Sequence, residues 1–138
     1  MSDIIFKINN LDRYDKDADE FISIVESIPN NASDQVIDAL FETFSNKEDF
    51  GIQETVLSKL DSIPDEKFVN GLIRNFDHIL DNSSEQEWAL LILGRYVNAD
   101  DKKRISMICE VGRKNISLFN FIKSDYFMEE YPEVKQYL

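Results

Sequence analysis

A chain of 138 residues with 43% hydrophobic residues can build one domain around its own core, and this composition excludes a disordered chain. The single cysteine excludes an internal disulfide, and the longest apolar run, Trp88–Leu93, is much shorter than the roughly 20 residues that cross a bilayer. The 27 acidic and 15 basic residues give a net charge of −12, which disfavours nucleic acid and anionic membranes as partners and favours a basic protein. We therefore expect a single soluble domain over residues 1–138, located in the cytoplasm.

Apolar residues recur at the three- and four-residue spacing of amphipathic helices along most of the chain. Residues 1–14 are compatible with either a strand or a helix that caps the N-terminal end. Beyond them we predict six helices and a tail, 113–138, which holds one or two short capping helices split near Ser124 and Asp125. The predicted helices cover about 15–28, 33–44, 51–63, 65–80, 84–98 and 100–111.

Several of these helix ends carry residues with a capping preference. Ser33 precedes an apolar helical pattern and is positioned as an N-cap. Ser84 and Glu87 have the spacing of a capping box at the start of the fifth helix. Gly112 is placed to end the sixth helix in the left-handed conformation.

An internal repeat is visible in the first half of the chain. Ser27-Ile28-Pro29 recurs 35 residues later as Ser62-Ile63-Pro64, the apolar positions around it recur as well, and a looser third copy follows. Any helical hairpin spaces its hydrophobic residues in this way, but the matching terminators favour a true repeat. A period in the mid-thirties built from two helices is typical of an α-solenoid. We therefore predict an all-α fold, a short α-solenoid of about three to four antiparallel helical hairpins.

The fifth predicted helix carries the most specific segment. Its run Trp88–Leu93 is apolar on all sides, which predicts a central core helix, and Gly94 predicts the close approach of a neighbouring helix. The segment 87–98, EWALLILGRYVN, followed by an acidic turn and another amphipathic helix, resembles a HEAT repeat. A small acidic chain with this segment also resembles the bacterial immunity proteins of polymorphic and contact-dependent growth inhibition toxin systems. That resemblance implies a binding protein without chemistry of its own, which covers the active or substrate-binding surface of a toxin.

The sequence contains no recognisable catalytic pattern. His78 is the one histidine; Asp77 and Asp81 lie beside it on one helix face, where a weak carboxylate metal site is conceivable, but we expect His78 to be an ordinary surface residue. Cys109 lies on an apolar helix face, which is typical of a buried and unreactive thiol. We predict that the protein is not an enzyme and has no catalytic residues, no cofactor and no metal.

Acidic residues line one side of two predicted helices. Asp34, Asp38 and Glu42 follow one another at four-residue spacing, and like charges at this spacing cost a helix about 0.2–0.5 kcal/mol per pair. Asp77 and Asp81 lie on the corresponding side of the helix 65–80. We predict that these five residues form an acidic strip that binds a protein surface rich in lysine and arginine, with a merely solvated face as the alternative.

Two functions fit this combination of fold and charge, and an enzyme with an unfamiliar carboxylate site is the disfavoured third alternative. The first is an inhibitor or immunity protein that neutralises a cognate toxin domain, expected to be basic and with a nuclease as one candidate, by occluding its positive surface. The second is a general helical-repeat adaptor or regulatory subunit with no toxin partner. The basic triplet Lys102-Lys103-Arg104 opens the sixth helix and suits an acidic patch either on a partner or on the same chain.

Overall fold

The protein is all-helical in the computed structural model, which describes residues 2–13, 16–45, 51–82, 84–98 and 102–138. Within these ranges there is no strand, so the predicted all-α class is confirmed. No helix in the described part of the chain has the length and apolar character needed to cross a membrane. The elements are α1 (Ser2–Asn10), α2 (Ala18–Ser27), α3 (Asp34–Phe41), α4 (Gln53–Ser62), α5 (Asp65–Asp81), η1 (Ser84–Gln86), α6 (Glu87–Val97), α7 (Lys102–Gly112), α8 (Ile116–Lys123), α9 (Asp125–Glu130) and η2 (Pro132–Tyr137).

Most predicted helices are present with ends shifted by a few residues. Residues 2–10 form a helix, so the strand alternative for the N-terminal segment is wrong. Ser33 caps α3 as predicted, because its side chain accepts a hydrogen bond from the Val36 N–H. The tail divides at Ser124, as expected, into α8 and α9. The predicted helix starts near residues 15 and 100 fall outside the described ranges.

Two predicted helix ends are wrong. The N-cap of α6 is Gln86, with a left-handed backbone and no side-chain cap bond, and not Ser84 of a capping box. Gly112 belongs to α7 and is not in the left-handed region. A Cβ at Gly112 would lie 3.2 Å from Ile122 Cδ1, so this glycine allows close packing of α8 against α7.

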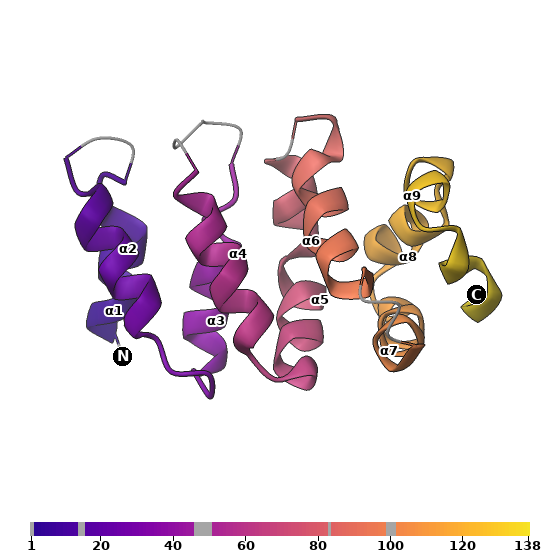
Figure 1. The fold of residues 1–138 in the computed structure, drawn as a ribbon, viewed down its shortest axis with the longest axis horizontal. Coiled ribbons are helices and arrows are strands. Elements are labelled where there is room, and N and C mark those ends of the chain that lie inside the picture. Colours follow the sequence, from indigo (N-terminus) through magenta and orange to yellow (C-terminus); the bar gives the residue numbers. More distant parts are fainter. Residues whose placement is uncertain (1, 14–15, 46–50, 83, 99–101) are drawn as a thin grey trace.

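The helices pack in two rows (Figure 1). In one row α1 contacts α3, α3 contacts α5 and α5 contacts α7; in the other row α2 contacts α4 and α4 contacts α6. The two rows meet where α1 packs on α2, α3 on α4 and α5 on α6. At the C-terminal end α8 packs on α5 and α7, and η2 packs on α7 and α9.

The repeated Ser-Ile-Pro segments end α2 and α4 in the same way. Ile28 and Ile63 both have extended backbones, and their N–H groups donate to the carbonyl oxygens three residues earlier, of Val25 and Leu60. Both helices then stop at proline, which cannot supply the next donor. Identical sequences therefore produce identical helix ends in two successive units.

Lysine side chains connect neighbouring units. Lys59 Nζ donates to the carbonyl oxygen of Ile28 at 2.7 Å and approaches that of Glu26 at 3.4 Å, which ties α4 to the C-terminal end of α2. Lys67 Nζ donates to Ala32 O at 2.9 Å and ties α5 to the segment before α3. Each ammonium group thus satisfies backbone acceptors that no helix bond reaches.

The fifth predicted helix is less enclosed than expected. Most of α6 is buried, but Leu91 keeps 42% of its surface exposed, so α6 is not a helix covered on all sides. Gly94 does allow a close approach, although its neighbour is the Tyr131 side chain rather than a helix backbone: the Tyr131 ring and hydroxyl occupy the space that a Cβ would need. Burial against α6 raises the pKa of Tyr131, with Glu130 and Glu133 adding to the shift.

Candidate protein-binding surface

The five predicted strip residues lie on two neighbouring helices. Helices α3 and α5 run parallel, because Asp38 of α3 lies beside Arg74 of α5 and the Glu42 carbonyl oxygen lies beside His78. Both contacts join residues 36 positions apart. The structure therefore brings together the two acidic segments that the sequence separates.

Asp38 already has partners within the chain. Its Oδ1 accepts from Arg74 Nη2 at 2.8 Å, from Arg74 Nε at 2.9 Å and from Asn75 Nδ2 at 2.8 Å. Arg74 Nη2 also lies 4.0 Å from Asp34 Oδ1. Asp38 is half-buried and binds α5 to α3, while Asp34 is exposed and only loosely paired. Arg74 therefore compensates one of the two negative charges at this end of the predicted strip.

The other three carboxylates have no ion-pair partner in the part of the chain that the structure describes. Glu42, Asp77 and Asp81 are exposed, and none of them forms an ion pair with a residue that the structure describes. We refer to these three residues as the acidic end. Glu42 is the C-cap of α3, and Asp77 and Asp81 belong to the last turn and a half of α5, so they lie where the helix dipole is negative. The acidic end therefore combines three carboxylates with the negative ends of two parallel helices.

The backbone under the acidic end is held by side chains of α5, of α6 and of the segment after α1. His78 Nε2, in the tautomer that carries the proton there, donates to Glu42 O at 3.3 Å. The buried Arg13 guanidinium donates to Thr43 O and stacks over the Phe21 ring, with 5.4 Å between Cζ and the ring centroid. Trp88 Nε1 donates to Ser45 O at 2.7 Å. The carbonyl oxygens of Glu42, Thr43 and Ser45 thus each accept a hydrogen bond from one of these side chains, and none of these partners was predicted.

His78 and Cys109 lie in the surroundings that the sequence predicted for them. His78 is exposed, as expected of a surface residue. Cys109 is 1% exposed, and burial raises the pKa of its thiol to about 11, with Arg113 acting in the opposite sense. Within the described ranges no three His, Cys, Asp or Glu side chains are grouped so that they could hold a metal ion.

In the basic triplet at the start of α7, Arg104 contacts residues of two other helices. Arg104 Nε lies 3.3 Å from Asp65 Oδ1, and its Cζ lies 4.9 Å from the Tyr96 ring centroid. Arg104 therefore joins α7 to α5 and α6, and this member of the triplet serves the same chain. Lys102 and Lys103 remain exposed.

Comparisons of the chain with protein-family models, with curated proteins and with solved structures give no match.

Proposed function

We propose that the chain is a HEAT/armadillo-like α-solenoid of three to four hairpins that binds another protein and performs no chemistry of its own. The two-row packing of the helices and the equal ends of α2 and α4 support a solenoid built from repeated units. In such proteins, extended surfaces shared by neighbouring repeats are the usual binding sites.

The partner in this proposal is a cation-rich protein, and the acidic end is where it docks. The observation that carries the proposal is that Glu42, Asp77 and Asp81 are exposed and unpaired within the described chain, at the negative ends of two helices. Such a group destabilises the helices that carry it, and a lysine or arginine of a partner removes that cost. The net charge of −12 steers a basic protein toward the chain and raises the rate of encounter.

The specific function that we propose is immunity against a cognate bacterial toxin. It follows from the resemblance of a small acidic chain with the HEAT-like segment 87–98 to bacterial immunity proteins. The chain would cover a basic active-site or substrate-binding surface of the toxin and exclude its substrate. A nuclease is a suitable toxin, because its phosphate-binding groove is positively charged.

The test is affinity purification of the tagged chain from its native organism at low salt, followed by elution at high salt. We expect a basic protein that elutes with salt, because exposed charge pairs are screened. Expression of that protein alone should stop growth, and co-expression of the chain should restore it. If the captured protein is harmless, the immunity function is wrong and an adaptor function remains; if no basic protein is captured, the binding proposal itself is wrong.

A further inference from the structure

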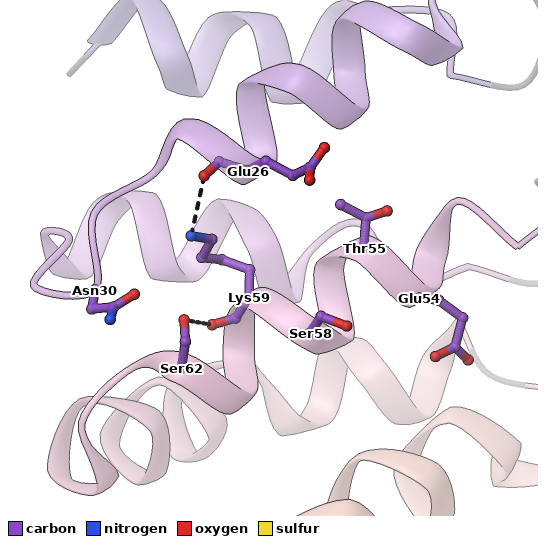
Figure 2. A pocket seen from close by; sticks show the side chains of 7 residues that line it. All are labelled: Glu26, Asn30, Glu54, Thr55, Ser58, Lys59 and Ser62. Carbon is purple, nitrogen blue, oxygen red and sulfur yellow. Dashed lines mark hydrogen bonds between the residues drawn. The ribbon is translucent and has the colours of Figure 1, made fainter.

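A groove of about 440 Å³ runs between α2 and α4, on the row of helices that does not carry the acidic end (Figure 2). Each residue that lines it has a polar side chain: Glu26, Asn30, Glu54, Thr55, Ser58, Lys59 and Ser62. The short side chains of Thr55 and Ser58 leave space along the α4 wall. Such a groove suits a polar side chain that brings hydrogen-bond donors.

The one cation in the lining does not neutralise the carboxylate beside it. The Lys59 ammonium donates to main-chain oxygens of α2, at 2.7 Å to Ile28 and 3.4 Å to Glu26. Figure 2 shows the Glu26 carboxylate turned away from this ammonium group and toward Thr55. Glu26 is exposed and forms no ion pair with any described residue.

The neighbouring pair of helices in the same row, α4 and α6, holds an arginine side chain between carboxylates. There Arg95 of α6 reaches across to α4, where Nη2 binds Asp61 Oδ2 at 2.5 Å and Nη1 binds Glu54 Oε2 at 3.4 Å. The hydrogen bond to Asp61 raises the pKa of Arg95 further. A guanidinium group is therefore already held between two helices of this row by carboxylates of α4.

The repeat relates this arrangement to the groove. Asp61 lies 35 residues after Glu26, which is the separation of the two Ser-Ile-Pro segments, so Glu26 is the counterpart on α2 of the main acceptor of Arg95. Leu90 and Val97 of the looser third copy match Val56 and Ile63 of the second copy at a separation of 34 residues. At this separation the counterpart of Arg95 on α4 is Asp61 itself. Between α2 and α4 the acceptor is thus present, but an acidic residue takes the place of the arginine.

We infer that the groove between α2 and α4 binds an arginine side chain of the partner protein, whose guanidinium pairs with Glu26 and hydrogen-bonds the Thr55 and Ser58 hydroxyls. Arginine suits this place because its planar guanidinium presents five donors, enough for a carboxylate and two hydroxyls at once. The inference rests on the proposed binding of a cation-rich protein and gives that protein a second point of contact, away from the acidic end.

The test uses the full chain and two short peptides of otherwise neutral residues, one with a single arginine and one with its uncharged isostere citrulline in that place. Amide chemical shifts are followed by NMR during titration. We expect the arginine peptide to shift residues of α2 and α4, including Thr55 and Ser58, and the citrulline peptide to have no effect. Glu26→Gln should weaken binding about fivefold, the upper range for one exposed ion pair, and Ser58→Phe, which fills the groove, should abolish it.

Asp61→Asn is the matched control, because it removes the repeat counterpart of Glu26 from a position outside the groove lining. The inference requires that this variant bind the arginine peptide as the wild type does. Shifts confined to α3 and α5, or equal binding by the Glu26→Gln variant, would overturn the groove site and leave the acidic end in place. Shifts in the groove without any basic protein captured from the native organism would instead reject the proposed function and keep the arginine site.

Discussion

Gly71 allows α5 to pack closely against α3. A Cβ at this position would lie 2.8 Å from Ile37 Cγ2 and 2.9 Å from Phe41 Cε2, and both of these side chains are fully buried. We predict that Gly71→Ala lowers the free energy of unfolding by about 1–3 kcal/mol, because overpacking outweighs the helix propensity gained. Urea denaturation measures this change.

Asn70→Ala is the control for this substitution. Asn70 is the preceding residue of the same helix and is exposed, so its replacement should change the free energy of unfolding by no more than about 0.5 kcal/mol. Equal stabilities for the two variants would mean that α5 does not pack against α3 as described.

Cys109 gives a prediction about pH. Burial raises the pKa of its thiol in the folded state to about 11, above the value in the unfolded chain. Both states hold the proton at neutral pH, and as the pH rises from about 9 toward 11 the unfolded state loses it first, so stability should fall. We predict that Cys109→Ala removes part of this fall, measured as the difference between the two pH profiles. Thiol reagents should label the wild type at neutral pH only when denaturant is added.

For single residues, the sequence predicted which side chains lie on a buried helix face and which cap a helix. It did not predict contacts between residues far apart in the chain. The burial of Cys109 and the cap at Ser33 follow from local spacing, which a sequence displays directly. The contact of Gly94 with Tyr131 joins positions far apart in the chain, and no local pattern specifies it. The tight packing at Gly71 was missed for the same reason.

At the scale of the helix, the acidic end should be a stability cost that the protein carries for binding. Asp77 and Asp81 lie near the negative end of α5 and have no cationic partner among the described residues. We predict that Asp77→Asn and Asp81→Asn each raise the free energy of unfolding, by about 0.3–1 kcal/mol at low salt. Thermal or urea denaturation at two salt concentrations measures the gain, which added salt should reduce.

Asp38→Asn makes the opposite prediction and serves as the comparison. Its carboxylate accepts hydrogen bonds from Arg74 and Asn75, so this variant should be less stable than the wild type. If all three substitutions stabilise the protein alike, the division of the predicted strip into a paired and an unpaired end is wrong.

Lys59 tests the connection between α2 and α4. Its ammonium group satisfies the Ile28 carbonyl oxygen at the end of α2, and hydrogen bonds to charged groups are stronger than neutral ones. We predict that Lys59→Met lowers the free energy of unfolding by about 1–2 kcal/mol. Lys102→Met, at the exposed start of α7, should leave it unchanged or slightly higher, because a cation there opposes the helix dipole. Equal effects of the two substitutions would argue against the Lys59 contact.

Helix positions were predictable because apolar spacing and proline stops are local signals, as α4 and α5 illustrate. The two helix ends that were predicted wrongly depend on tertiary packing. Gly112 stays within α7 because α8 packs against it. Helix α6 begins at a backbone kink at Glu85 and Gln86. The strip residues were correctly assigned to neighbouring helices. That Asp38 forms an ion pair while Glu42, Asp77 and Asp81 form none among the described residues was not predicted. This difference depends on Arg74 reaching Asp38 rather than solvent.

For the whole molecule, the all-α class followed from periodicity, and the acidic charge suggested the chemistry of the partner. Periodicity cannot reveal which row of helices faces that partner, because both rows carry exposed acidic residues. The structure distinguishes the two rows. One ends in Glu42, Asp77 and Asp81, which form no ion pair among the described residues, and the other contains the groove beside Glu26. Binding through both surfaces would explain why the acidic residues are spread over most of the chain.

The measurement that tests the central claim most directly is the affinity of the captured basic protein for the chain and for its Glu42→Lys/Asp77→Lys/Asp81→Lys variant, at low and at high salt. These positions are exposed, so circular dichroism and thermal unfolding should confirm that the variant folds. We predict that the charge reversal weakens binding at least about a hundredfold at low salt, roughly 2.7 kcal/mol, and that high salt narrows the difference. Equal affinities of the two proteins at low salt would contradict the account.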